Sequence, residues 1–394
     1  MSVAKAVLER LLRRGESARL RGADERASLS MTGTKEYTAL RSLAELELFH
    51  AEVALAEHDG AIAVHREYRS GDGSRLLRLS VLDLAVLARH LGVKLLDDRV
   101  TEAAHQLDAW TTRFPVVVEV LDSWRHGHKV RGFGAEAAED LARAAIAVAA
   151  RTDDASHERI LRRESVRLFG DSKRLENLTA WLDLLVTGEL VASGLSKEEI
   201  WSAIGLRREP QPMLLAGVGS VELVELCLPL VRPYLGLPVE SVRAVTTSAR
   251  CMLSIENLAS FHDAARAPGA EAVLLLYTGG MPSPAWRAAY ASILSRAPSA
   301  WPIYHWGDID EGGFRIAAAV ADVARGVGHA LQPWMMSPLD LPRAIMQRAA
   351  LPSKPQLAAM TRWADRAGWS GIASDLSGRP LLLEQESLDP TFPP

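Results

Sequence analysis

Two kinds of hydrophobic periodicity divide the chain. In residues 1–150 apolar positions recur mostly at the spacing of amphipathic helices. The helices predicted there are Ala4–Arg14, Lys35–Glu57, Leu82–His90 and the alanine-rich run Ala135–Ala150. From residue 213 onward short apolar runs alternate with amphipathic ones. The strands predicted there are Ala244–Glu256, Ala272–Thr278, Trp301–Asp308 and Ala330–Met335, and the helices are Ser283–Ala297 and Gly313–Ala324. This alternation predicts a largely parallel sheet with helices on both faces.

The N-terminal part also contains a predicted β-hairpin. Ala61–Tyr68 and Ser74–Ser80 alternate between apolar and polar residues, and Ser70-Gly71-Asp72-Gly73 between them is a strong turn signal. Helices that flank such a hairpin fit a winged helix-turn-helix, a common DNA-binding shape. The alternative is a small α+β subdomain with another role.

The middle of the chain carries a basic stripe. Arg159, Arg163 and Arg167 are spaced i, i+4 and i+8, which in a helix places them on one face. Such a stripe suits a phosphate backbone. The alternative is a solvated face on which the arginines pair with Glu158 and Glu164.

Proline residues and the change of periodicity set the expected domain boundaries. Pro210 and Pro212 interrupt the chain just before the strand-rich part. We therefore expect three domains, covering residues 1–150, 151–212 and 213–394.

Composition narrows the class of protein. The net charge of −4 means that any DNA-binding surface is a local patch. Two cysteines give neither a zinc spacing nor a disulfide framework. The longest apolar runs are too short to span a bilayer, and Met1–Arg14 lacks the apolar stretch of a secretion signal. We expect a cytoplasmic protein without membrane contact or an organic cofactor.

The sharpest chemical signal is an Asp-x-Asp motif after an apolar strand. Asp308 and Asp310 point to the same side of an extended chain, whereas Ile309 points to the opposite side. Gly312 and Gly313 then let the chain turn tightly into the next helix. The carboxyl edge of an open α/β sheet, where this motif is predicted to lie, is where such sheets bind ligands.

A second strand-ending carboxylate belongs to Glu256. Three carboxylates at one sheet edge repel each other, and a divalent cation relieves that repulsion. Oxygen ligands favour Mg²⁺ or Mn²⁺, which activate water in phosphodiester cleavage. Glu256, Asp308 and Asp310 are therefore the predicted metal-binding and catalytic residues.

Two further pairs are candidates. Glu384 and Glu386 are also spaced i and i+2, and they are candidate metal ligands or surface carboxylates. Lys173 and Arg174 are candidate DNA contacts together with the arginine stripe.

Several motifs resemble the JetD family of bacterial Wadjet defence systems, whose catalytic part is a Toprim domain. The similar segments are Leu168-Phe169-Gly170-Asp171-Ser172-Lys173-Arg174-Leu175-Glu176, Ser254-Ile255-Glu256-Asn257-Leu258-Ala259-Ser260-Phe261, Thr278-Gly279-Gly280, His305-Trp306-Gly307-Asp308-Ile309-Asp310 and Leu383-Glu384-Gln385-Glu386. The specific motifs lie in residues 160–390.

The resemblance implies an architecture similar to the A subunit of type IIB topoisomerases, with a helical arm, a winged-helix domain and a Rossmann-like Toprim domain. It makes residues 151–212 the winged-helix domain, which competes with the hairpin near residues 61–80. It also implies a homodimer that works with an SMC-like ATPase complex and cleaves closed-circular plasmid DNA. By motif match, Glu256 is the Toprim glutamate, and Asp308 and Asp310 are the metal-binding pair.

Type IIB topoisomerases attack DNA with a winged-helix tyrosine. Before residue 234 the chain offers only Tyr37 and Tyr68, and neither lies in a matching motif. Hydrolysis by metal-activated water is therefore the preferred prediction. The alternatives are a transesterase that uses a tyrosine and a non-catalytic winged-helix DNA-binding adaptor.

Overall fold

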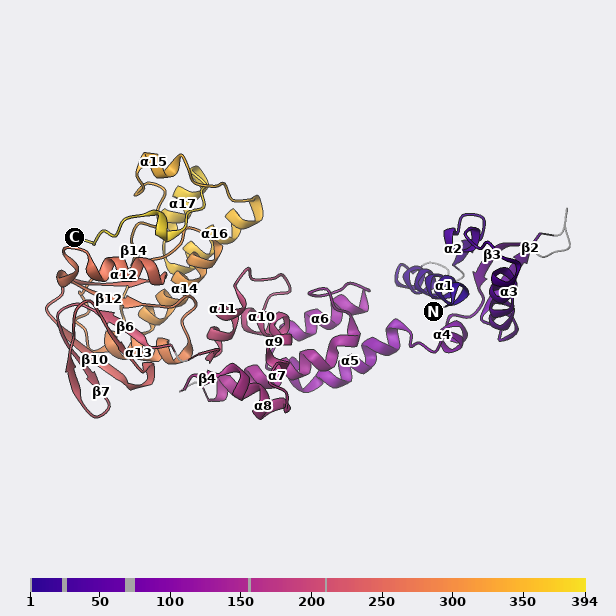
Figure 1. The fold of residues 1–394 in the computed structure, drawn as a ribbon, viewed down its shortest axis with the longest axis horizontal. Coiled ribbons are helices and arrows are strands. Elements are labelled where there is room, and N and C mark those ends of the chain that lie inside the picture. The colour runs from indigo at the N-terminus through magenta and orange to yellow at the C-terminus, as the bar shows by residue number, and fades with distance from the viewer. Residues whose placement is uncertain (1, 23–26, 68–74, 155–156, 210) are drawn as a thin grey trace. The chain divides into compact units, whose positions relative to one another are not determined.

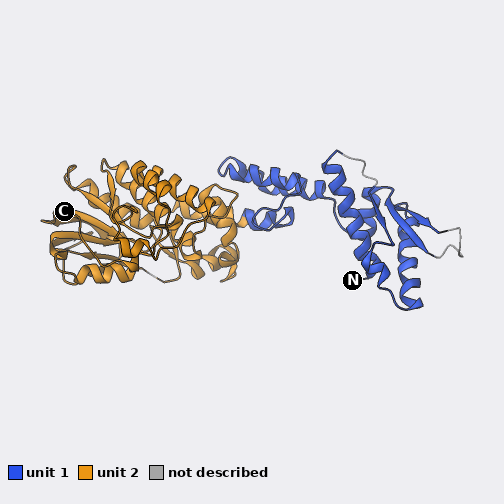
Figure 2. Ribbon diagram, turned by 90° about the horizontal axis from the view of Figure 1, so that it is seen from above, with its two compact units in different colours: residues 1–142 blue, residues 143–394 orange. Residues whose placement is uncertain are grey.

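The computed structural model describes residues 2–22, 27–67, 75–154, 157–209 and 211–394. The chain forms two compact units, residues 1–142 and 143–394, which Figure 2 shows in two colours. No helix in the described ranges combines the length and the apolar character that a membrane crossing needs.

The first part of unit 1 packs helices on a three-stranded antiparallel sheet. Its elements are α1 (Val3–Leu20), β1 (Ser28–Ser30), α2 (Lys35–Thr38), α3 (Leu43–His58), β2 (Ile62–Arg66), β3 (Leu76–Val81) and α4 (Leu84–Leu91). The strand order is β1-β3-β2. The two predicted hairpin strands do pair, whereas the predicted turn 70–73 lies outside the described residues.

The helix predicted over Lys35–Glu57 is two helices. Ser42 begins α3 with a capping box, in which its side chain accepts a hydrogen bond from the Glu45 amide and Glu45 accepts one from the Ser42 amide. This cap favours a new start over continuation from α2. The rest of unit 1 is helical, with α5 (Leu96–Thr111) and α6 (Val116–Arg125), which the sequence pattern did not predict individually. Helix α7 (Ala138–Asp153) begins in unit 1 and continues into unit 2.

Unit 2 begins with short helices between two very short strands (Figure 1). The elements are β4 (Arg159–Ile160), α8 (Leu161–Phe169), α9 (Arg174–Asn177), α10 (Thr179–Thr187), α11 (Lys197–Ala203) and β5 (Leu206–Arg207). Strands β4 and β5 pair in parallel. Arg159 therefore belongs to a strand, and the expected helical stripe of Arg159, Arg163 and Arg167 is wrong for its first member.

The centre of unit 2 is a six-stranded mixed sheet in the order β14-β13-β11-β12-β6-β9. Its strands are β6 (Met213–Ala216), β9 (Leu235–Leu237), β11 (Cys251–Ile255), β12 (Val273–Tyr277), β13 (Ile303–Trp306) and β14 (Leu331–Pro333). Four neighbouring strands are parallel, while β6 is antiparallel to both of its neighbours, β12 and β9. The α/β character of this region is as predicted, and the sheet is mixed because β6 runs opposite to the other five strands.

The run predicted as one strand, Ala244–Glu256, is two strands in different sheets. Strand β10 (Val242–Thr247) joins β7 (Gly219–Leu223) and β8 (Cys227–Pro229) in a separate antiparallel sheet. The chain then turns and enters the central sheet as β11. The apolar residues on both sides of the turn are buried, so their pattern does not reveal the break.

The order of the central strands creates a topological switch point. The chain leaves β11 through α12 (Leu258–Arg266) to β12 on one side of it. It leaves β13 through α14 (Glu311–Gly326) to β14 on the other side. A crevice therefore opens outside the carboxyl ends of β11 and β13, which is where open α/β sheets bind ligands.

The remaining helices follow or cover this sheet. They are α13 (Pro284–Ser295), α15 (Arg343–Met346), α16 (Lys354–Ala367) and α17 (Ser370–Gly378). Helix α14 packs against α13 and α16, and α16 packs against α17. After α17 the chain runs back across the sheet edge, where Leu383 pairs with Ile309.

Candidate metal centre

Glu256 and Asp308 meet at the switch point. Strands β11 and β13 pair in parallel, with Ile255 opposite Trp306. The amide of Glu256 donates to the Trp306 carbonyl at 3.1 Å. The Asp308 amide donates in turn to Oε2 of Glu256 at 3.4 Å. The two predicted carboxylates are thus neighbours, 52 residues apart in the sequence.

The backbone between them is closely packed. A Cβ atom on Gly307 would lie 2.4 Å from Oε2 of Glu256 and 3.2 Å from Nε2 of His305. Nδ1 of His305 lies 2.9 Å from Oγ of Ser254, and the ring is fully buried. Burial lowers the pKa of His305 to about 3, so the ring is neutral. Its Nε2 has no hydrogen-bond partner among the described residues.

Asp310 begins the next helix. Its Oδ1 accepts a hydrogen bond from the Gly313 amide at 2.7 Å, which caps α14. A Cβ atom on Gly313 would lie 2.2 Å from the Asp308 carbonyl oxygen, so no larger residue fits there without a shift of the backbone. The glycine predicted to allow a tight turn thus allows the helix to start directly after the acidic pair.

Gln385 connects the C-terminal segment to both strands, a role that the sequence reasoning missed. Its side chain is 1% exposed, its Nε2 donates to the Trp306 carbonyl at 3.1 Å, and its Oε1 accepts from the Asn257 amide at 2.9 Å. Its own amide donates to Oδ1 of Asp308 at 2.6 Å. The sequence signal that could have identified Gln385 was its uncharged amide between Glu384 and Glu386, in the segment Leu383-Glu384-Gln385-Glu386.

The C-terminal segment also brings two carboxylates to the site. One oxygen each from Asp308, Glu384 and Glu386 lie within 4.8 Å of one another, a spacing that a cation could bridge. Asn257 donates from Nδ2 to Oε1 of Glu386 and accepts two amide hydrogen bonds at the start of α12. Asp308 is therefore common to two carboxylate groups, one with Glu256 and one with the C-terminal pair.

Burial and mutual repulsion raise two pKa values in this cluster. Desolvation, followed by the charges of Asp308, Asp310 and Glu199, raises the pKa of Glu256 well above its ordinary value. Desolvation raises the pKa of Asp308 to about 7, with further contributions from Asp310, Glu384 and Glu386. The hydrogen bond from the Gln385 amide opposes that rise. A divalent cation would favour the charged forms of both groups.

The cluster lines a cleft of about 580 Å³. Its walls include the carboxylates of Glu199, Glu256, Asp308, Asp310, Glu311 and Glu384, and also Arg348. Arg348 is exposed and forms no ion pair with any described residue. The Ala350 carbonyl accepts from the Leu382 amide at 2.8 Å, which ties the segment after Arg348 to the C-terminal strand. An arginine that faces the cleft without a partner is available to an anionic ligand.

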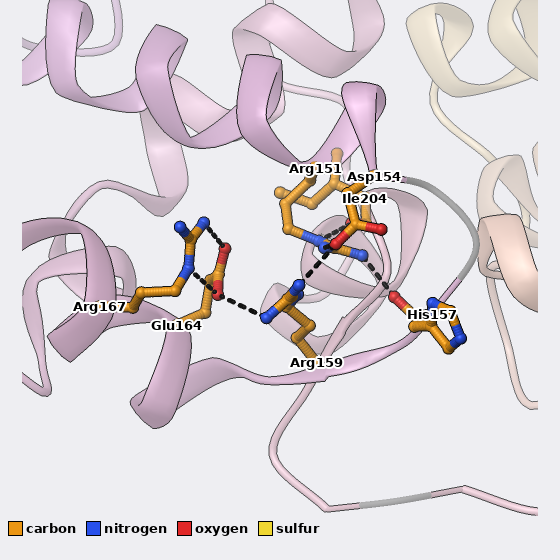
Figure 3. A network of polar contacts seen from close by, with 7 residues as sticks. All are labelled: Arg151, Asp154, His157, Arg159, Glu164, Arg167 and Ile204. Carbon is orange, nitrogen blue, oxygen red and sulfur yellow. Dashed lines mark hydrogen bonds and ion pairs between the residues drawn. The ribbon is translucent and has the colours of Figure 1, made fainter.

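The expected basic stripe is largely engaged within the protein (Figure 3). Glu164 is 2% exposed and forms ion pairs with Arg167 at 2.6 Å and Arg159 at 3.8 Å. Arg159 also contacts Asp154 at 2.6 Å. The hydrogen bond from Arg167 is the main reason that the pKa of Glu164 is lowered. The pairing with Glu164, the alternative considered from the sequence, is present in the structure.

Three other candidate cations of this segment differ in their surroundings. Arg163 and Lys173 are exposed, and the Lys173 amide is held by Oδ1 of Asp171 at 2.9 Å. Arg174 is half-buried. These residues lie on separate elements, α8 and α9.

The fold and the site together define an α/β domain with a cluster of carboxylates at the switch point of its parallel strands. Comparison with protein families adds the particular relationship: the model of the family described as "Wadjet protein JetD, C-terminal" matches residues 225–392. The C-terminal region of the chain is thus similar to the C-terminal region of Wadjet JetD proteins. No curated protein matches the chain. The matched residues include Glu256, Asp308, Asp310 and the whole C-terminal segment.

Proposed function

We propose that the chain is a Mg²⁺- or Mn²⁺-dependent DNA endonuclease of a Wadjet defence system. The observation that carries this proposal is the meeting of carboxylates from three distant segments beside the switch point. They come from the end of β11, the turn after β13 and the C-terminal segment. Repelling carboxylates held in one partly buried cluster favour a divalent cation.

The residues of the site would divide the work as follows. Glu256, Asp308 and Asp310 would hold the cation, with Glu384 and Glu386 as further ligands. The bound cation would supply an activated water and stabilise the leaving oxygen in phosphodiester hydrolysis. Glu256 is the candidate general base, because its carboxylate lines the cleft beside Asp308 and burial raises its pKa. Arg348 would contact the scissile phosphate from the opposite wall.

The family name implies the setting of this activity. A Wadjet protein is expected to act with other Wadjet subunits, here an SMC-like ATPase complex, on closed-circular plasmid DNA. Two copies of the chain in a homodimer would bring two sites to one duplex and permit a double-strand cut. Within this proposal the region around the central sheet is a Toprim domain.

The winged-helix domain is proposed for residues 3–91 rather than for residues 151–212. Its elements follow the order α1-β1-α2-α3-β2-β3, and its sheet is antiparallel. The described residues of the middle segment form only one pair of strands, which are parallel and two residues long. Helix α3 has no Lys or Arg but carries Glu45, Glu47, Glu52 and Glu57. Such a helix does not attract phosphates, so DNA contact is proposed for other surfaces.

The tyrosine-dependent alternative has little support. The Tyr37 hydroxyl accepts from the Leu76 amide at 3.3 Å and lies 3.2 Å from Nε2 of His50, so it is held inside unit 1. Tyr68 lies outside the described residues. Hydrolysis therefore remains the preferred chemistry.

The decisive experiment compares plasmid cleavage by the Asp308→Ala protein and the wild type, each with its partner complex and Mg²⁺. We expect the variant to lose cleavage, because Asp308 belongs to both carboxylate groups. Asp365→Ala, an exposed aspartate on α16, is the matched control and should cut normally. Wild-type cutting by the Asp308 variant would refute the site. Metal-independent DNA binding with no cleavage under any condition would instead support the adaptor alternative.

A further inference from the structure

Unit 1 contains a basic groove of about 620 Å³. We use this name for the surface between the second half of α1, the start of α5 and the loop after α6. Its cationic or imidazole side chains come from all three walls: Arg13, Arg21, Arg99, His126, His128 and Lys129. It lies outside the family match and outside every site predicted from the sequence.

The loop that forms one wall is held against α1. Gly127 has a φ of +73°, and a Cβ atom on it would lie 2.9 Å from Cδ1 of Leu20 in α1. The loop is closed on itself, because the His128 amide donates to the Ser123 carbonyl at 2.9 Å. Trp124 is buried beneath it and donates from Nε1 to the Phe133 carbonyl at 3.0 Å. The third wall is tied to α1 by Glu16, whose Oε1 accepts from the Leu96 amide at 2.7 Å.

The anionic residues of the groove are occupied, whereas its outer cations are not. Glu16 is engaged by the Leu96 amide, and Glu136 by the Gly134 amide at 2.9 Å and more distantly by Arg99. Arg13 and Lys129 are exposed and form no ion pair with any residue that the structure describes. Arg21 is exposed, and among the described residues its guanidinium donates only to the Ser17 hydroxyl, at 2.7 Å.

The chemistry of the groove selects an extended polyanion. Residues 125–134 contain three Lys or Arg and two His with no Asp or Glu, in a chain whose net charge is −4. A concave surface with one sign of charge concentrates counter-ions, and neutralised phosphates are the main source of sequence-independent DNA affinity. An acidic protein is the other polyanion, but protein interfaces depend on aromatic anchors. The aromatic residue of this groove, Trp124, is only 1% exposed.

We infer that the basic groove binds the phosphate backbone of duplex DNA and gives unit 1 a DNA contact separate from the acidic cleft. The inference depends on the proposed function in one respect only, the identification of the polyanion as DNA. Because the groove reads phosphates and not base edges, its affinity does not depend on the DNA sequence.

The test measures binding of a labelled DNA duplex to the full-length protein by fluorescence anisotropy in EDTA, from 50 to 200 mM KCl. The test variant is Arg13→Ala/Arg21→Ala/Lys129→Ala. Each phosphate contact contributes about 0.9 to the slope of log affinity against log salt, so the slope should become shallower by about 2.7. The loss should be the same for two duplexes of unrelated sequence.

Two controls separate charge at the groove from charge in general. Lys5→Ala/Arg41→Ala/Arg89→Ala removes three exposed cations of unit 1 that do not line the groove, and should leave the slope nearly unchanged. Arg13→Lys/Arg21→Lys keeps the groove charge and should bind nearly as the wild type. Equal slopes for the test variant and the wild type would overturn the inference and leave an acidic protein as the ligand.

The assay contains no divalent cation, so its outcome is independent of cleavage. If the Asp308→Ala protein still cuts DNA while the groove variant loses affinity, the proposed nuclease site fails and the groove stands. If the Asp308→Ala protein is inactive while the groove variant binds normally, only the groove inference fails.

Discussion

The acidic cleft of unit 2 and the basic groove of unit 1 carry opposite charges, and they differ in how their charged residues are brought together. The cleft gathers carboxylates from segments more than 50 residues apart and fixes them by backbone and Gln385 hydrogen bonds. The groove takes most of its cations from two short stretches, the end of α1 and the loop after α6, and leaves them exposed. In the cleft, burial raises the pKa of Glu256 and Asp308. The groove cations that come from these two stretches face water instead.

The difference fits the functions proposed for the two surfaces. Cleavage needs ligands placed to within a fraction of an ångström, and desolvated carboxylates that a cation can compensate. Backbone binding needs only accessible positive charge, because counter-ion release depends on how many phosphates are neutralised. A surface for chemistry is therefore built from tertiary contacts, and a surface for holding DNA can be built from local sequence.

The largest expected effect comes from removing the innermost carboxylate. Glu256→Ala should lower the single-turnover rate of plasmid cleavage by about 10³-fold, since cation stabilisation contributes several kcal/mol and each 1.36 kcal/mol is a factor of ten. DNA affinity in EDTA should not fall, because a negative charge has been removed. The exposed Glu240→Ala is the matched control. A rate within tenfold of the wild type would contradict the proposal that cleavage depends on the acidic cleft while DNA binding depends on the basic groove.

A smaller effect is expected at Gln385, which positions the site without joining it. Gln385→Ala removes the hydrogen bonds to Trp306 and Asn257; the Asn257 amide loses its partner, whereas the Trp306 carbonyl keeps the Glu256 amide. We expect the cleavage rate to fall about 10²-fold, as displacement of a catalytic group by about 1 Å typically produces. Anisotropy measurements should give an unchanged DNA affinity. Loss of affinity together with rate would indicate a general structural defect instead.

The next effect concerns folding stability and the cations that do not face DNA. Glu164→Gln should lower the free energy of unfolding by about 2 kcal/mol, because the buried Glu164 carboxylate loses its charge-assisted hydrogen bonds from Arg167 and its ion pair with Arg159. Arg163→Ala, on the same helix but exposed, should change it little. Denaturant titration of both variants decides the matter, and equal midpoints would contradict the ion-pair network as a source of stability.

The same glutamate predicts a pH effect. The folded-state pKa of Glu164 is lowered, so its contribution is present above the unfolded value and is lost as the pH falls through the folded value. The Glu164→Gln penalty should therefore shrink in acid. A penalty that is constant from neutral pH to strongly acidic pH would argue against this assignment.

The smallest effect is the opposite pH slope at the cleft. The pKa of Asp308 is about 7 in the folded, metal-free protein and near 3.8 when unfolded. The folded state binds the extra proton between these values, so stability should fall as the pH rises from about 4 to about 7. Asp308→Asn should make that slope shallower in EDTA, and the raised pKa of Glu256 accounts for the slope that remains. Calorimetric Mn²⁺ affinity should rise over the same interval, because cation and proton compete; a flat profile would disconnect Asp308 from the metal.

Local patterns correctly predicted many of the strands and helices of unit 2. Strands β12 and β13 and helices α13 and α14 lie where apolar periodicity placed them, because each buries one face or is fully buried. Local patterns did not separate β10 from β11, and they did not reveal that β6 runs antiparallel to its neighbours β12 and β9. Buried residues have the same apolar pattern whichever sheet a strand joins and whichever direction it runs.

By itself the sequence determined that carboxylates end strands and precede glycine-assisted helix starts, because residue type, strand period and turn chemistry are properties of a few consecutive residues. Only the tertiary structure decided that β11 and β13 are neighbours, that Gln385 joins them and that Arg159 pairs with Glu164. Strand order and long-range pairing depend on which buried surfaces fit together across the whole chain. That free energy is shared among distant residues and leaves no local pattern.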